Sequence, residues 1–201
     1  MRLGREYAKL WLGNAISNLG DGVTFVAAPL LASMLTDDPA LVAGVPLAYT
    51  LPRIFTSMFT GVLVDRVDRR VLMVSVNLGR AGLTALLGFA VLGGFANIVL
   101  MYAVFAALGV LETAADNASF AVLPSVVGND HLDRANSRIA SAQLVADEFV
   151  GPPLGGFLFG VAAALPILFD AASFAGAAVC FLFLRGRFRV PVRGGDAEQE
   201  S

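Results

Sequence analysis

Long apolar segments alternate with short polar breaks along the chain. Each segment exceeds the roughly 20 residues that a helix needs to cross a bilayer. Each is also much longer than the roughly 10 residues of a membrane β-barrel strand. Because lipid offers no water to backbone groups, only helices and closed barrels span it. The pattern therefore predicts six membrane helices, over residues 8–35, 40–64, 71–93, 97–122, 135–160 and 163–184.

The composition supports a membrane location. Hydrophobic residues make up 57% of the 201 positions and charged residues 15%, and the mean hydropathy is +0.73. A soluble domain carries about 25% charged residues, so this chain has too little charge to cover a water-facing surface. We expect an all-α bundle of six transmembrane helices over 1–188, and a polar tail or severed linker over 189–201. Its first partner is the lipid bilayer, and nucleic acid is not expected.

Basic residues outside the spans are confined to alternate connections. They occur in the N-terminal tail, between the second and third spans, between the fourth and fifth, and in the C-terminal tail, while the other three connections have none. Cytoplasmic loops carry the excess of Lys and Arg. The distribution predicts a multi-pass protein of the plasma (inner) membrane with both termini in the cytoplasm. Arg far outnumbers Lys, which indicates a GC-rich bacterial source.

Ionisable and polar residues interrupt the spans at helical spacing. A charge at the centre of a membrane helix costs roughly 2.5–3.5 kcal/mol on insertion scales, so these groups must face the bundle interior or one another. Five charges from five spans fall at similar depth, and polar stripes recur at intervals of three and four residues. We interpret them as the wall of a substrate and proton pathway, formed by Asn14, Asn18, Asp21, Arg53, Arg80, Glu112, Asp116 and Asp147.

Within this set, Glu112 and Asp116 are the expected protonatable pair, since neighbouring carboxylates share a proton readily. Arg53 and Arg80 are their expected partners. An alternative is that both arginines are structural clamps and that the Asn stripes only join helices. Asp147 and Glu148 should point about 100° apart, so at most one of them is expected to face the cavity. Asp170 could reach the outer interface.

The connection between the second and third spans reads Gly61-Val-Leu-Val-Asp65-Arg66-Val-Asp-Arg69-Arg70. Glycine lets neighbouring helices approach closely, and a carboxylate at a helix end can pair with a helix N-terminus or with arginine. This segment resembles the signature cytoplasmic loop of the major facilitator superfamily. The resemblance implies that Gly61, Asp65, Arg66, Arg69 and Arg70 help to hold one state of an alternating-access cycle. Asp68 stands where the family usually has Gly.

The fifth span contains Gly151-Pro152-Pro153-Leu154-Gly155-Gly156. Proline bends a helix and glycine permits close packing, so we expect a bend and a close contact from Gly151, Pro152, Gly155 and Gly156. The segment resembles the Gly-Pro-x-x-Gly-Gly element of proton-coupled drug antiporters, although Asp147 replaces a preceding Gly of that pattern. The stretches 123–125 and 132–136, with Asp21 and Asp170, resemble the enterobactin-exporter-like branch of the superfamily.

These resemblances imply the N-terminal six-helix half of a major-facilitator fold. The implied activity is transmembrane transport by an antiporter, the proton-coupled efflux of a small amphiphilic molecule of drug or siderophore type, from an incomplete or half-size transporter. A half would need a C-terminal six-helix partner or a second copy of itself. The alternative is a non-transporting membrane accessory protein or an inactive fragment.

Catalysis is not expected. No hydrolase, Walker or dinucleotide motif occurs. His131 is the sole histidine and Cys180 the sole cysteine, so a metal site is not expected either. Asn18 replaces the first Gly of the Gly-x-Gly-Asp motif of intramembrane aspartyl proteases. We therefore expect no enzyme activity and no cofactor.

Overall fold

The computed structural model describes residues 4–185, except for the side chains of 58, 59, 61–66 and 129. Within this part of the chain the regular secondary structure consists of helices joined by short connections. The predicted tail at 189–201 lies outside the described residues. The elements are α1 (Arg5–Leu35), α2 (Pro39–Arg66), α3 (Arg69–Leu92), α4 (Ile98–Val127), a short 3-10 turn η1 (Asn129–His131), α5 (Leu132–Leu144), a π-helical segment η2 (Val145–Val150), α6 (Gly151–Val161) and α7 (Leu165–Leu182).

The helices agree with the apolar segments to within a few residues. Because α5, η2 and α6 are continuous, they form one rod over Leu132–Val161. In the described part of the chain, five helices are long and apolar enough to cross a membrane, namely α1, α3, α4, this rod and α7. The fourth helix is longer than predicted. It includes Pro124 and is followed directly by Gly128. The φ of Gly128, 73°, belongs to the left-handed region that favours glycine.

Side chains with short polar groups begin three of the helices. Asp38 accepts a hydrogen bond from the backbone N–H of Ala40 at the start of α2, and Asn97 caps α4 in the same way. Asp68 accepts from the N–H of Arg70 at 3.0 Å. Such caps satisfy amide groups that have no partner within the helix. Asp68 is therefore suited to start α3, which explains its place in the loop where the resembled family has Gly.

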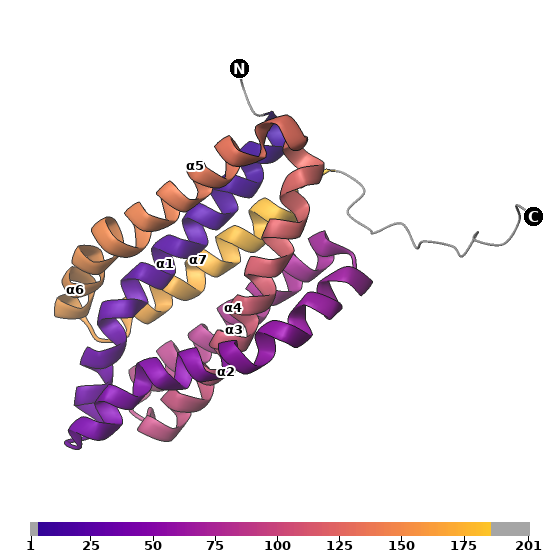
Figure 1. Ribbon diagram of the computed structural model, residues 1–201. Helices are drawn as coiled ribbons and strands as arrows, with labels where there is room; N and C mark the ends of the chain where they lie inside the picture. Colours follow the sequence, from indigo (N-terminus) through magenta and orange to yellow (C-terminus); the bar gives the residue numbers. More distant parts are fainter. Residues whose placement is uncertain (1–3, 186–201) are drawn as a thin grey trace, which may run out of the picture.

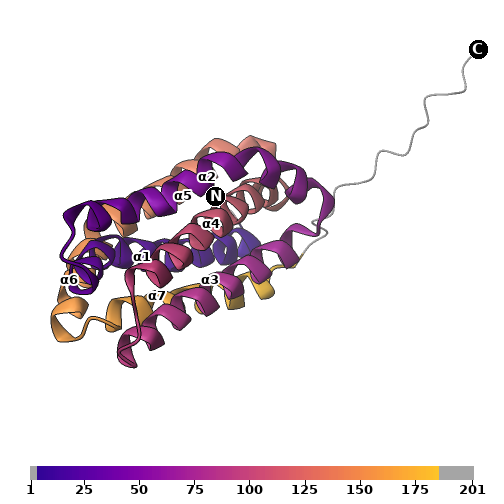
Figure 2. The same ribbon diagram turned by 90° about the horizontal axis from the view of Figure 1, so that it is seen from below.

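The helices form three layers, as Figure 2 shows. α3 and α7 pack together on one side, α1 and α4 lie in the middle, and α2 and the α5–α6 rod lie on the other side. α2 packs against α4, and the rod packs against α1. Figure 1 shows the same helices lengthwise, at right angles to this view. This leaves the side bounded by α2 and α5 as the more open side of the bundle.

Two apolar clusters fill the bundle, one toward each end. The first contains Leu10, Met73, Leu123 and Phe181, and the second contains Leu31, Leu87, Met101 and Ile167. Buried polar residues lie between them along the helices, among them Ser17, Thr24, Arg80, Glu112, Asp170 and Ser173. A polar layer enclosed by two apolar clusters is the arrangement that the mid-span charges require.

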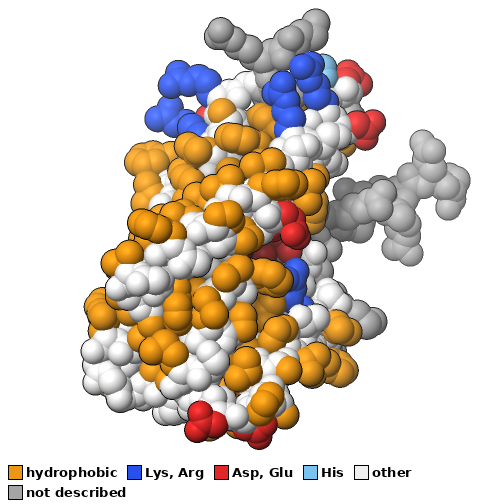
Figure 3. All heavy atoms as spheres, turned by 90° about the vertical axis from the view of Figure 1, so that its left-hand side faces the viewer, with side chains coloured by type: hydrophobic (Ala, Val, Ile, Leu, Met, Phe, Trp, Pro, Cys, Tyr) orange, Lys and Arg blue, Asp and Glu red, His pale blue; other side chains and the backbone are white. Residues whose placement is uncertain are grey.

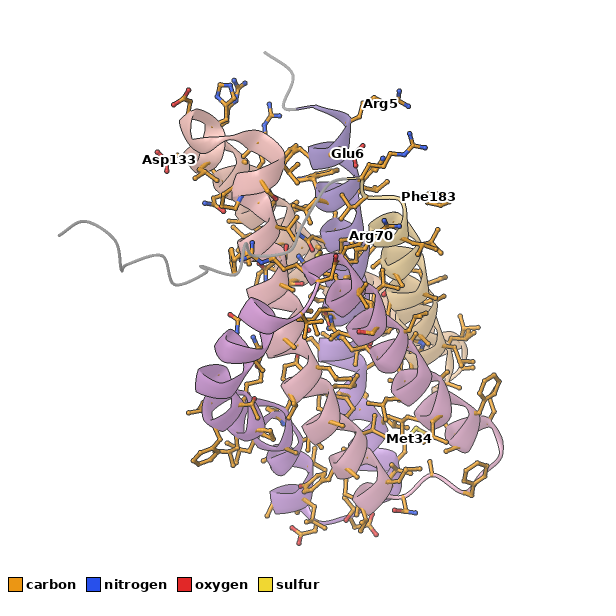
Figure 4. The ribbon with its side chains drawn as sticks, turned by 90° about the vertical axis from the view of Figure 1, so that its right-hand side faces the viewer. Arg5, Glu6, Met34, Arg70, Asp133 and Phe183 are labelled. Atoms are coloured by element: carbon orange, nitrogen blue, oxygen red, sulfur yellow. The ribbon has the colours of Figure 1, made fainter. Side chains whose placement is uncertain are left out.

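The basic connections lie together at one end. In Figure 4, Arg5, Arg70, Asp133 and Phe183 lie at this end, whereas Met34 lies near the other. On the face in view, Figure 3 likewise shows Lys and Arg side chains gathered at one end, with acidic groups beside them, and only acidic groups at the other end. We call this the basic end. The arrangement is the alternation that the distribution of Lys and Arg predicts.

Candidate transport cavity

Arg80 of α3 lies at the centre of the polar layer, where it joins three helices. Its side chain is 3% exposed. One terminal nitrogen, Nη2, donates to both carboxylate oxygens of Asp21 on α1, at 2.7 and 2.9 Å. The guanidinium also forms an ion pair with Glu112 on α4. We call Asp21, Arg80 and Glu112 the inner charge cluster. Its existence confirms the expectation that Arg80 pairs with carboxylates at depth.

Further contacts fix the orientation of the guanidinium. Nη1 of Arg80 donates to the hydroxyl of Ser17 at 3.3 Å. The guanidinium carbon lies 3.9 Å from the ring centroid of Phe174 on α7. A cation over an aromatic ring gains electrostatic stabilisation, and the gain grows when both are desolvated. Arg80 is therefore held from four directions.

Asp170 of α7 is buried beside this cluster. Its carboxylate is 1% exposed and accepts hydrogen bonds from the hydroxyls of Thr24, at 2.8 Å, and Ser173, at 3.3 Å. Asp170 therefore does not reach the outer interface, which the sequence left open as an alternative. The physical reason is that α7 packs on α1 and presents this turn to the interior. The signal in the sequence was Ser173, three residues further on, which shares a helix face with Asp170.

Arg53 of α2 and Asp116 of α4 form a second, more open pair. Their nearest charged atoms are 3.4 Å apart, and their side chains are 36% and 43% exposed. Arg53 also lies over the ring of Tyr49, 5.3 Å from its centroid. We call Arg53 and Asp116 the open charge pair. Glu112 and Asp116, predicted as one protonatable pair, thus belong to two different ion pairs.

A cavity of about 640 Å³ opens between α1, α2, α4 and η2. Its volume is that of a small-molecule site. Figure 3 shows acidic and basic side chains together midway along a mainly apolar face of the bundle. Of the predicted pathway residues, the cavity lining includes Asn18, Asp21, Arg53, Glu112 and Asp147. The lining also includes Tyr49 and Gln143, which sequence reasoning missed, and Thr24, Glu148 and Asp170, which were not assigned to the pathway.

The other predicted pathway residues lie outside this lining. Asn14 donates to the hydroxyl of Ser119 on α4 at 2.8 Å, so it joins two helices, as the alternative interpretation of the Asn stripes has it. Arg80 lies behind Asp21 and Glu112, and Asp116 pairs with Arg53 at the edge of the cavity.

The π-helical segment changes which side chains face the cavity. The N–H of Gly151 donates to the carbonyl of Ala146, five residues earlier, which is the π pattern. Asp147 and Glu148 both line the cavity. The expectation that at most one of them does so is wrong, because it assumed the 100° step of a regular α-helix. The wider π turn brings consecutive side chains closer in direction.

Two glycines of the Gly-Pro element, Gly151 and Gly155, make the predicted close contact with α1. A side chain at Gly151 or Gly155 would collide with the backbone of Gly22 and Val23 on α1, respectively. Gly156 faces open space. Pro152 follows directly on η2, and its missing N–H fits a place where the regular ladder is interrupted. The element thus joins the α5–α6 rod to α1 beside the cavity.

The loop motif is only partly described. Arg69 donates to the carbonyl of Ala121 on α4 at 2.8 Å, and Arg70 donates to the carbonyl of Leu182 at the end of α7. Both arginines therefore tie the α2–α3 connection to other helices at the basic end. The surroundings of Gly61 and the side chains of Asp65 and Arg66 are not among the described features. Within the described part of the chain, no cluster of His, Cys, Asp and Glu is arranged to hold a metal ion.

Comparison with known proteins gives consistent matches. The family model described as "Transmembrane secretion effector" matches residues 4–198. An uncharacterized MFS-type transporter of Mycobacterium tuberculosis is 32% identical over 151 residues, which are 73% of this chain and 33% of the relative. The uncharacterized MFS-type transporter YkuC of Bacillus subtilis is 27% identical over 177 residues, which are 85% of this chain and 39% of YkuC. The chain thus spans between a third and two fifths of the length of these relatives.

Proposed function

We propose a transport function on the ground that the chain belongs to the transmembrane secretion effector family of MFS-type (major facilitator superfamily) transporters. In this proposal residues 1–188 form one six-helix half-unit of the superfamily fold, with both ends at the cytoplasmic face. Residues 189–201 are a tail or the beginning of a linker. The grouping of Arg5, Phe183 and the basic connections at one end supports this orientation.

One observation carries the transport proposal, the cavity of about 640 Å³ with charged groups at mid-depth of an apolar bundle. Ionisable groups at that depth are expensive, and in membrane proteins they mark substrate or ion pathways. Asp21, Asp147 and Glu112 enter the lining from three different segments. A bundle that only needed to be stable would gain nothing from opening these groups to a cavity.

We propose that the open charge pair is the proton-responsive part of the site. Asp116 is half exposed and has one ion-pair partner, Arg53, so a proton can reach its carboxylate without dismantling the core. Protonation would remove the charge that holds Arg53 and release the guanidinium toward the cavity. The direction of transport, efflux of a small amphiphilic molecule in exchange for protons, rests on the resemblance to the antiporter and exporter branches.

The half-unit needs a second one to close the cavity. The cavity opens between α2 and the π segment, on the side of the bundle where the described residues form no further layer. Superfamily halves are parallel repeats with the substrate site between them. We propose that a second six-helix unit, either a C-terminal half or a second copy of this chain, covers this side.

Transport in inverted membrane vesicles tests this proposal. Ethidium, an aromatic cation, suits a lining in which carboxylates outnumber guanidiniums. Its addition should dissipate an imposed proton gradient, followed by a fluorescent pH probe, and Asp116→Asn should abolish the effect. Asp133→Asn, an exposed carboxylate at the basic end, is the matched control and should behave as the parent. Equal rates for the parent and Asp116→Asn would remove Asp116 from the mechanism.

A further inference from the structure

A second, larger cavity of about 980 Å³ lies between α1 and α5 at the basic end. Apolar and small side chains form most of its lining, including Trp11, Leu19, Ala142 and Val145. Arg5 and Arg138 line it nearest the basic end. We call this cavity the α1–α5 groove.

The groove is separate from the transport cavity. The two linings share no residue, and they lie on different faces of the α5–α6 rod. Ala142 and Val145 face the groove, whereas Gln143 and Asp147 face the transport cavity. The contact between α1 and the rod thus divides two cavities, and only one of them carries acidic groups in its lining.

Local sequence explains why the groove exists. Deep in the bundle α1 and the α5–α6 rod touch, because Gly22 packs against the backbone of Ala146 and Gly151. Toward the basic end they separate, and two aromatic side chains bridge the gap. Tyr7 donates to the carbonyl of Ala135, and the indole N–H of Trp11 donates to the carbonyl of Arg138, both at 3.2 Å. Alanine side chains on both helices then leave the space beside these bridges unfilled.

The two arginines of the groove differ from the neighbouring lysine. Lys9 is paired with Glu6 at 2.7 Å and also donates to a backbone carbonyl. Arg5 and Arg138 are exposed, and neither guanidinium has a hydrogen bond or ion pair to the residues that the structure describes. Two guanidiniums without a partner among the described residues, at the mouth of an apolar groove, are complementary to a ligand with an anionic head and an apolar tail.

We propose that the α1–α5 groove binds an anionic phospholipid, with its phosphate between Arg5 and Arg138 and one acyl chain along Trp11 and Leu19. From Arg5 to Leu19 the groove runs about 21 Å along α1. One leaflet of the hydrocarbon core is about 15 Å thick, so the groove reaches from the headgroup level to mid-depth. Basic pockets between membrane helices favour anionic headgroups, and tryptophan is typical of the interface.

Trp11 makes the proposal directly measurable, because it is the only tryptophan in the chain. The full chain is placed in phosphatidylcholine bilayers that contain a small fraction of lipid with brominated acyl chains, which quench tryptophan on contact. Brominated phosphatidylglycerol, which is anionic, should quench Trp11 at lower fractions than brominated phosphatidylcholine. We expect roughly a five-fold weaker apparent affinity for each arginine removed. The attraction of one basic residue to an anionic membrane surface corresponds to about this factor.

The double variant Arg5→Gln/Arg138→Gln should lose the preference for phosphatidylglycerol. Arg134→Gln is the matched control, because Arg134 is also exposed on α5 but does not line the groove. Helix content by circular dichroism shows that the variants are folded. Equal quenching by the two lipids would identify ordinary surrounding lipid and overturn the proposal. Quenching by neither would show that protein covers the groove, and would overturn it too. The measurement requires no transport activity, so its result is independent of the proposed function.

Discussion

The inner charge cluster and the open charge pair are one helical turn apart on α4, yet the protein surrounds them very differently. Arg80 is 3% exposed and is held by Asp21, Glu112 and the ring of Phe174. Arg53 and Asp116 are more than a third exposed, and a single 3.4 Å contact joins them. Similar charges at similar depth therefore have dissimilar freedom to change partners.

This difference separates two roles that the sequence suggests together. Removing one member of a fully buried ion pair leaves an uncompensated charge, which is strongly destabilising. An exposed pair contributes little to stability, so the fold does not depend on keeping Arg53 and Asp116 together. The inner charge cluster should hold α1, α3 and α4 together, while the open charge pair is free to respond to protons and substrate.

The largest effect is expected from Arg80→Ala. It leaves Asp21 and Glu112 facing each other without a cation, and the free energy of unfolding should fall by about 3–5 kcal/mol. Arg53→Ala, the matched change in the open charge pair, should cost less than about 1 kcal/mol. Both can be measured as the fraction of folded protein left by size exclusion in detergent after heating. Similar losses for the two variants would break the comparison.

A smaller effect is expected where the α5–α6 rod closes the cavity against α1. Gly155→Leu forces a side chain into the backbone of Val23, and overpacking of this kind costs about 1–3 kcal/mol. Gly156→Leu, one residue further on, enters open space and should be neutral. The same heating assay compares them. If Gly156→Leu were the more damaging change, the rod would be rotated relative to α1.

Thr24→Val should destabilise by about 1–2 kcal/mol, because the buried carboxylate of Asp170 loses a hydroxyl donor. The shape of the side chain is conserved, so packing is unchanged. Ser33→Val is the control, since Ser33 is exposed and its hydroxyl only donates to a carbonyl of its own helix. Equal stability of Thr24→Val and the parent would show that the hydroxyl of Ser173 is sufficient for the carboxylate of Asp170.

The smallest change in stability is expected for Asp116→Asn, which should stay within about 1 kcal/mol of the parent. The amide can still accept a hydrogen bond from Arg53, and the side chain is partly in water. Chemical unfolding followed by circular dichroism measures the change. A loss as large as that of Arg80→Ala would place Asp116 among the structural charges.

The sequence predicted the helices and the pairing of buried arginines well, for a physical reason. Lipid enforces long apolar segments, and a charge at depth must find a partner, so a pairing of Arg53 and Arg80 with buried carboxylates follows from the residue types alone. Which carboxylate pairs with which arginine did not follow. It depends on helix packing, which places Arg53 of α2 beside α4 and Arg80 of α3 between α1 and α4.

Other features could not be predicted because they depend on departures from regular helices. The π segment turns both Asp147 and Glu148 toward one cavity. A prediction based on the period of a regular α-helix does not include the wider π turn. The position of Asp170 was left open because depth along a helix says nothing about the face that α7 turns to α1. Asn14 shares a stripe with Asn18 and Asp21, yet its partner Ser119 takes it out of the cavity lining.

Cysteine accessibility measures the difference between the two charge groups most directly. Cys180 is the only native cysteine, so Cys180→Ser supplies a silent background. Asp116→Cys reports on the open charge pair, and Ser173→Cys, at a position that is 7% exposed beside Asp170, reports on the interior. A positively charged thiol reagent should modify position 116 in membrane vesicles and leave position 173 unmodified. Equal modification of both positions, or of neither, would contradict a transport cavity that is open to water at Asp116 and closed at Ser173.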